Sequence, residues 1–160
     1  FQWEAQDSKE LLREKQAYLR QKLRHPGIRF NYHDVDTSFL EAVFARGDRR
    51  LGQVLNRAVD LGCSFDGWDE QFQTQKWEQA FADCGIDPYA YAHAKYELDA
   101  PLPWDHLSSG VKKRFLLKER KAAYAELTTA DCRGAQCTGC AVCFDLRVEN
   151  DLVQREGFHG

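Results

Sequence analysis

Four cysteines near the end of the chain have the types and spacing of metal ligands. Cys132, Cys137, Cys140 and Cys143 follow the pattern Cys-x4-Cys-x2-Cys-x2-Cys. Small residues between them, such as Gly139, allow the chain to reverse and bring four sulfurs to one point. Thiolates are soft ligands that select zinc, copper(I) or iron–sulfur clusters. The spacing therefore predicts one metal centre bound by these four side chains.

The spacing separates the candidate metals only in part. Structural zinc sites usually pair two Cys-x2–4-Cys knuckles across a longer loop. Cysteines at successive x2 spacings are instead typical of the compact ligand runs of ferredoxin-type clusters. The pattern favours a 4Fe–4S cluster and leaves zinc as the alternative. Because four thiolates complete either site, we expect a structural or electron-carrying role and no open position for a substrate.

A third interpretation of the same residues is that they are unligated buried thiols. The segment has no apolar periodicity that would support it.

The composition is that of a folded chain. Its 160 residues are 43% hydrophobic, which is enough to form a core. The net charge of -3 argues against a general nucleic-acid binder, which needs a basic surface. We expect a cytoplasmic protein with no membrane contact, because no apolar run reaches the ~18 residues that span a bilayer. The chain starts at Phe1 and contains no methionine, so we expect a piece of a longer protein.

Helical patterns dominate the part of the chain before the cysteines. Asp7-Ser8-Lys9-Glu10 is expected to form an N-cap with an acidic residue three places on, and the helix that follows is expected to stop at His25-Pro26-Gly27. The alternation of Ile28, Phe30 and Tyr32 with polar residues then predicts a short strand.

A helical hairpin is predicted next, between Ser38 and Gly62. Ser38 and Glu41 resemble a capping box, and Gly47 is expected to end the first helix. The second helix is expected to bury one apolar stripe, formed by Leu51, Val54, Leu55, Ala58 and Val59.

Further helices are predicted up to the cysteine segment. One is expected to end at Gly85, a short one to follow Asp87-Pro88, and the longest to cover residues 108–127. The basic residues of the longest helix are expected to face mostly outward; they are Lys112, Lys113, Arg114, Lys118, Arg120 and Lys121. The tryptophans Trp68, Trp77 and Trp104 are interpreted as core anchors.

The turn of the predicted hairpin is a possible anion-binding site. Arg46, Arg49 and Arg50 lie at a predicted helix start, where guanidinium groups and backbone N–H groups both attract anions. The competing interpretation is that these arginines are solvated or paired with Asp48.

Four stretches stand out when the chain is taken as a whole. They are Phe1-Gln2-Trp3; Arg46-Gly47-Asp48-Arg49-Arg50-Leu51 running to Gly62 and Phe65-Asp66-Gly67-Trp68; Leu102-Pro103-Trp104-Asp105 with Gly110-Val111 and Phe115-Leu116; and Thr129-Ala130-Asp131-Cys132-Arg133 through Cys143. Together they resemble the C-terminal region of a family of cobalamin-binding-domain radical SAM proteins. The match covers most of the chain in order, and the last two stretches are the most specific. The family usually carries glycine where this chain has Ala141.

The resemblance implies a place for this chain within a larger enzyme. In such proteins a cobalamin-type domain precedes a partial β/α barrel, whose Cys-x3-Cys-x2-Cys loop binds the cluster that cleaves S-adenosylmethionine. That loop is absent here. The resemblance therefore implies that this chain follows the radical SAM barrel, that S-adenosylmethionine and cobalamin belong to the parent protein, and that this part is inactive alone. By analogy, the partners of the family are RNA or ribosome-associated substrates.

We therefore expect a mainly α-helical fold with one short strand or hairpin and a C-terminal four-cysteine metal-binding segment. The expected divisions are residues 1–7 as the tail end of the preceding barrel or a linker, 8–127 as a helical domain, 128–143 as the metal-binding segment, and 144–160 as a C-terminal tail or linker. The expected function is that of an accessory domain of a radical SAM enzyme, with an auxiliary cluster for structure, electron relay or substrate positioning. The alternative is a zinc-stapled module that binds protein or RNA through its basic helix without catalysis.

Overall fold

The described part of the chain is mainly helical, with irregular segments between the helices. The structure is a computed structural model that describes residues 2–132 and 137–148. It divides into two compact units, Gln2–Trp104 and the residues from Asp105 onward. The prediction of a mainly α-helical fold is confirmed. None of the described helices is long and apolar enough to cross a membrane.

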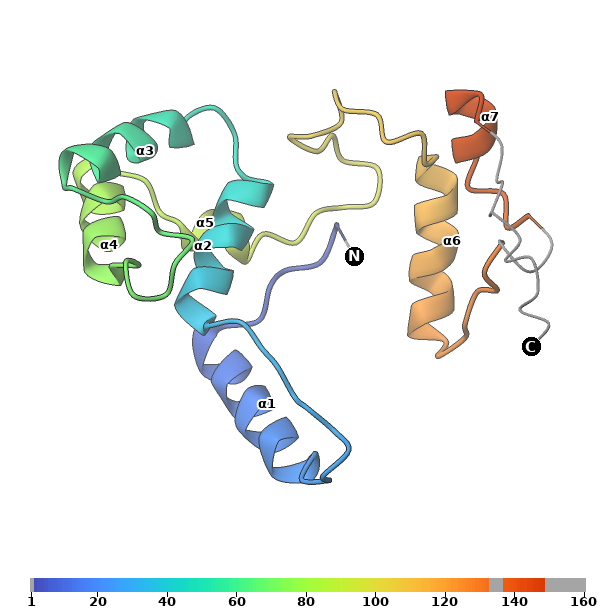
Figure 1. Cartoon of the computed structure of the whole chain (residues 1–160). Coiled ribbons are helices and arrows are strands. Elements are labelled where there is room, and N and C mark those ends of the chain that lie inside the picture. The colour runs from blue at the N-terminus through green and yellow to red at the C-terminus, as the bar shows by residue number, and fades with distance from the viewer. Residues whose placement is uncertain (1, 133–136, 149–160) are drawn as a thin grey trace, which may run out of the picture. The chain divides into compact units, whose positions relative to one another are not determined.

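The first unit is built from short helices joined by irregular segments (Figure 1). They are α1 (Lys9–Lys22), α2 (Val35–Arg46), α3 (Leu51–Asp60), α4 (Thr74–Asp83) and α5 (Tyr89–Ala92). Helix α3 packs against α4, α2 packs against α5, and α1 contacts α2.

Side-chain caps decide where the first two helices begin. The cap of α1 lies within the predicted stretch Asp7-Ser8-Lys9-Glu10, and the capping residue is Ser8, whose hydroxyl accepts a hydrogen bond from the backbone N–H of Leu11 at 3.2 Å. The predicted capping box at Ser38 is wrong. Helix α2 begins earlier, because the carboxylate of Asp34 accepts from the backbone N–H groups of Asp36 and Thr37 at 2.9 and 3.0 Å.

The predicted short strand is also wrong. Ile28 and Tyr32 are exposed and lie in irregular backbone between α1 and α2. A strand needs a neighbouring strand to take up its backbone hydrogen bonds, and the described residues offer none. The segment lies along α1 instead: the side-chain amide of Gln16 donates to the carbonyl oxygen of His33 at 3.0 Å, and the guanidinium of Arg20 lies over the ring of Tyr32.

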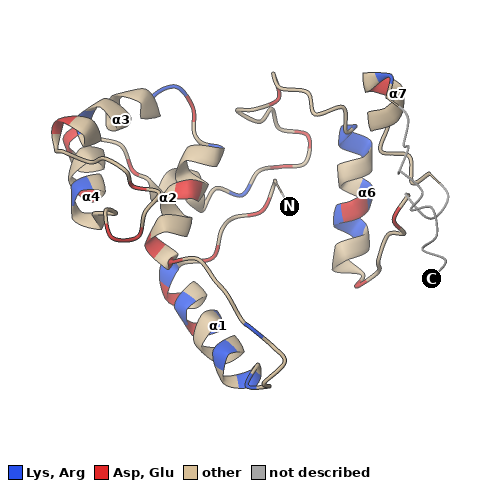
Figure 2. Ribbon diagram, in the orientation of Figure 1, with Lys and Arg blue, Asp and Glu red and all other residues tan. Residues whose placement is uncertain are grey.

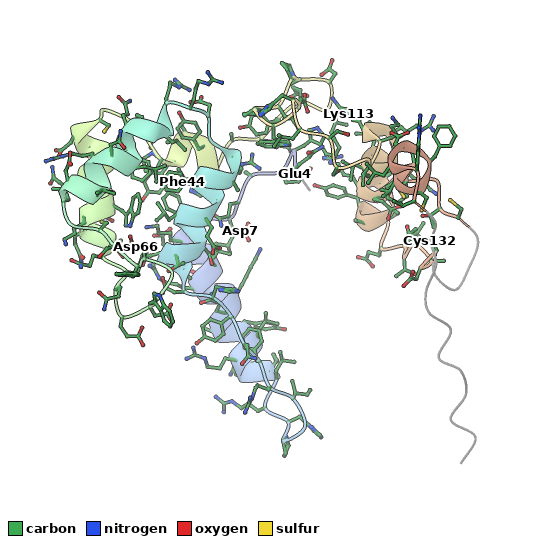
Figure 3. All side chains as sticks on the ribbon, turned by 45° about the horizontal axis from the view of Figure 1, so that its top comes forward. Glu4, Asp7, Phe44, Asp66, Lys113 and Cys132 are labelled. Carbon is green, nitrogen blue, oxygen red and sulfur yellow. The ribbon has the colours of Figure 1, made fainter. Side chains whose placement is uncertain are left out.

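The core of the first unit lies between α2, α3, α4 and α5. Its buried side chains are Phe39, Val43, Leu51, Val54, Ala58, Cys63, Trp77, Ala80, Phe81 and Ala92. Figure 3 labels Phe44, whose ring meets that of Trp77 edge to face, with 5.6 Å between the ring centroids. This core positions the helices without any buried charged side chain among the described residues.

The buried stripe of α3 is narrower than the sequence pattern predicts. Leu51, Val54 and Ala58 are buried, whereas Leu55 and Val59 are 46% and 68% exposed. One packed neighbour, α4, covers only one side of a helix, so the outer part of the stripe faces away from it.

The three tryptophans interpreted as core anchors also differ in how deeply they are buried. Trp77 is buried as predicted and Trp104 is partly buried, but Trp68 is 66% exposed. Trp68 sits in the loop before α4 and is not a core anchor.

The guanidinium group of Arg46 ties together the two ends of the first unit. Its Nε donates to the carbonyl oxygen of Tyr91 at 3.1 Å, and its Nη1 donates to those of Gln2 and Glu4 at 3.3 and 2.8 Å. Its Nη2 donates to the carbonyl oxygen of Ala94. All three nitrogens are therefore used to bind the N-terminal segment to the end of α5.

The N-terminal segment packs into the unit. Trp3 is only 1% exposed, and its carbonyl oxygen accepts from the backbone N–H of Tyr96 at 2.9 Å. The backbone N–H of Gln6 donates to the carbonyl oxygen of Ala92 at 3.0 Å. Although residues 1–7 are predicted to be a barrel end or linker, the described part of this segment, from Gln2, belongs to the packing of the helical unit.

The second unit contains α6 (Lys113–Tyr124) and the short helix α7 (Val142–Leu146). Helix α6 is shorter than the predicted range 108–127, because Lys112 before it is extended and Gly110 has a φ of +79°. Lysine and arginine recur along α6, in blue in Figure 2. The predicted tail begins within a helix, since α7 runs to Leu146, and residues 149–160 of that tail lie outside the described part.

Replacing Arg46 by lysine is expected to destabilise the first unit by about 1–3 kcal/mol, because one ammonium cannot reach carbonyl groups that the flat guanidinium spans. Urea unfolding followed by circular dichroism measures the loss. The matched control is Arg49→Lys on the exposed turn that follows, which should change the free energy of unfolding by less than about 0.5 kcal/mol. Equal effects of the two substitutions would contradict the role given to Arg46.

Candidate metal centre

All four predicted cysteine ligands line one cavity in the second unit. Cys132, Cys137, Cys140 and Cys143 surround a space of about 540 Å³. The other residues along its wall are Arg114, Gly139, Ala141, Phe144 and Val148. Figure 3 labels Cys132 in the segment that follows α6. The fold thus places the four cysteines around one cavity, although their spacing in the sequence is unequal.

The four cysteines are more exposed than thiols of a hydrophobic core would be. Cys137 and Cys143 are exposed, and Cys132 and Cys140 are only partly buried. No sulfur of this set is fully buried, so these cysteines are not core thiols. Cys63 differs in this respect, since it is buried in the first unit and its burial raises the pKa of its thiol.

The four sulfurs line the cavity without converging on one point. Within the described residues, no three cysteine, histidine or acidic side chains stand close enough together to hold a metal ion. Residues 133–136, between the first two predicted ligands, lie outside the described part.

Two contacts attach the cysteine segment to Lys112, the residue directly before α6. The backbone N–H of Lys112 donates to the carbonyl oxygen of Cys140 at 3.1 Å. The ammonium of Lys112 forms an ion pair with Asp145 on α7. The backbone N–H of Asp145 donates to the carbonyl oxygen of Ala141 at 2.9 Å, within the first turn of α7. The cysteine segment is therefore attached to the start of α6 at Cys140 and at Asp145.

Gly110 allows the loop before α6 to approach α7 closely. Its φ of +79° lies in the left-handed region, and a Cβ atom added there would meet Cγ of Leu146 at 3.1 Å. The sequence pattern assigns no structural role to Gly110, which is named only as part of the third stretch that resembles the family. Its packing role depends on a contact with a residue 36 positions later, which no local pattern reveals.

The turn that leads into α7 contains a strained alanine. Ala141 has a φ of 77°, and Gly139 before it has a φ of +83°. The left-handed conformation costs a non-glycine residue roughly 1–2 kcal/mol, because Cβ approaches a carbonyl oxygen. Ala141 directly follows Cys140 and opens the helix that carries Cys143. The backbone strain therefore lies between two predicted ligands.

The predicted anion site, at the turn between α2 and α3, leaves little room for a ligand. The donors of Arg46 are taken by carbonyl groups, as described above. The guanidinium of Arg50 donates two hydrogen bonds to the carboxylate of Asp48, with Nε–Oδ1 and Nη2–Oδ2 distances of 3.0 and 2.7 Å. This pairing lowers the pKa of Asp48 and raises that of Arg50. An anion would have to displace Asp48, and Arg49 is the remaining exposed arginine of the predicted set.

Arg114 is the residue of the cavity that the sequence pattern does not single out. The helical periodicity of α6 places it among the outward basic residues. It lines the cavity because the cysteine segment folds back over the first turn of α6.

Comparison of the chain with protein-family models, curated proteins and solved structures found no match.

Ala141→Gly is expected to stabilise the turn before α7 by up to about 1 kcal/mol, because relief of the left-handed strain exceeds the added freedom of the unfolded chain. Hydrogen exchange of the α7 amides in the metal-free chain should slow accordingly. The control Ala123→Gly, on the exposed face of α6, should instead destabilise its helix by about 0.5–1 kcal/mol. Faster exchange of α7 in the Ala141 variant would contradict the assigned strain.

Proposed function

We propose that Cys132, Cys137, Cys140 and Cys143 bind a 4Fe–4S cluster, and that the chain is the C-terminal accessory part of a radical SAM enzyme. The observation that carries the proposal is the single cavity that all four cysteines line. The cluster would serve structure, electron relay or substrate positioning. Because the four thiolates occupy its coordination positions, it would not bind the substrate directly.

The chemistry of the cavity wall supports an iron–sulfur cluster. Among the described residues that line it, sulfur is the only metal-binding donor type, with no histidine or carboxylate beside it. Such a donor set selects iron–sulfur clusters or zinc over harder metals. The space of about 540 Å³ leaves room for either centre, so the choice of a cluster rests on the compact spacing of the cysteines.

Two backbone features support the resemblance on which the enzyme assignment rests. Ala141 has the left-handed conformation that glycine adopts without strain, and glycine is the residue that the family usually carries there. Gly110, in the third matching stretch, packs against α7 with little room for a side chain. Both positions are therefore constrained by the backbone around the cysteine segment.

The parent enzyme would provide the parts that this chain lacks. A preceding barrel would bind the catalytic cluster and S-adenosylmethionine, and a further domain would bind cobalamin. The substrate would be RNA or a ribosome-associated molecule, by analogy with the family. Within this scheme the chain itself would bind the auxiliary cluster and attach it to α6 through Lys112 and Asp145.

The purified chain, reconstituted without oxygen with iron and sulfide, is expected to hold about four iron atoms and to turn brown. Iron, sulfide and zinc analysis with visible absorption measures this. Cys137→Ser should lose most of the iron, while Cys84→Ser, which changes a cysteine of the first unit that does not line the cavity, should keep it. A colourless chain with one tightly bound zinc would favour the alternative, a zinc-stapled module that binds protein or RNA. The absence of any bound metal would contradict both the cluster and the zinc module.

The enzyme assignment has a separate test, the sequence encoded upstream of this chain in its gene. We expect a Cys-x3-Cys-x2-Cys loop there, because the parent protein must bind a cluster with an open iron for S-adenosylmethionine. Sequencing the gene is sufficient to check it. An upstream region without that loop would overturn the radical SAM assignment and leave the four-cysteine site standing.

A further inference from the structure

Among the described residues that line the cavity of the four cysteines, one side chain is positively charged. Arg114, in the first turn of α6, is the only charged residue among the described residues that line it. The neighbouring basic residues are placed differently. Lys112 is paired with Asp145, and Lys113 does not line the cavity.

A filled four-thiolate site would attract such a charge. Four thiolates carry more negative charge than a zinc ion or an oxidised cubane cluster can neutralise, so the filled site has a net charge of about minus two. Arg114, Cys137 and Cys143 are exposed, so water partly screens the attraction between the guanidinium and the site, and its effect is modest. The remaining lining residues besides the cysteines are Gly139, Ala141, Phe144 and Val148, and none of them carries a charge.

We propose that Arg114 is the positioning residue that balances the charge of the metal centre and stabilises its bound and reduced forms. This inference rests on the proposed function, since it requires a metal centre on the four cysteines. One-electron reduction of a cluster by an external chemical reductant adds one negative charge to it. A fixed cation beside the thiolates stabilises that added charge, and therefore raises the reduction potential of the cluster. The same attraction stabilises the negatively charged filled site, and hence metal binding.

The test compares three substitutions in the reconstituted chain: Arg114→Gln, Arg114→Lys and Lys113→Gln. The first removes the proposed cation, the second keeps its charge, and the third removes a neighbouring charge that does not line the cavity. Two properties are measured: the midpoint potential, by reductive titration followed by absorption, and the affinity for Co²⁺ alone, by competition with a chelator.

Arg114→Gln is expected to make reduction up to about tenfold less favourable, which for one electron is a potential about 59 mV lower. Its affinity for Co²⁺ should fall by roughly tenfold, the lower end of the losses seen when groups around metal ligands are removed. Arg114→Lys should recover most of both properties, and Lys113→Gln should stay within about twofold of the unmodified chain.

Equal behaviour of Arg114→Gln and Lys113→Gln would overturn this inference while leaving the metal centre intact. If the chain binds zinc and forms no cluster, the Co²⁺ affinities alone decide it. If the unmodified chain binds no metal through its cysteines, the proposed function fails first, and the role of Arg114 fails with it.

Discussion

The helical unit depends on one guanidinium group that joins backbone from its two ends. Arg46, at the end of α2, donates to carbonyl groups of Gln2, Glu4, Tyr91 and Ala94. The apolar core packs α2 through α5, but it does not by itself close the unit where the chain enters and leaves. A flat, permanently charged donor can satisfy several carbonyl groups in nearly one plane, which no other side chain does. Arginine at this position is therefore required by structure, and little of it remains to bind an anion.

The second unit is organised by contacts of the backbone and not by a large core. No residue of α6 or α7 is fully buried, and the two helices are connected through the hydrogen bond from Lys112 to Cys140 and the ion pair with Asp145. A segment with so few buried apolar contacts gains much of its order from whatever its polar groups bind. A metal on the four cysteines would supply cross-links that apolar packing does not supply here. The structural and electron-carrying roles proposed for the centre are thus compatible with each other.

The positions where prediction and structure differ share a cause. The apolar pattern of α3 includes Leu55 and Val59, which the structure exposes, and the alternation around Ile28 produces no strand. Periodicity reports which residues would lie on one face of an element, but a neighbour must be present to cover that face or pair with that edge. Trp3 shows the reverse case: nothing in the sequence around it predicts burial, yet it is among the most completely buried side chains.

The sequence alone determined the helical class, the stretch from Asp7 to Glu10 that caps the first helix, and the four candidate ligands, because each depends on residues close together in the chain. Only the tertiary structure decided that all four cysteines line one cavity, that Arg114 lines it with them, and that Gly110 must stay small. These facts depend on contacts between residues far apart in sequence. Local propensity and spacing contain no information about which distant side chain will lie opposite, so only the folded chain reveals it.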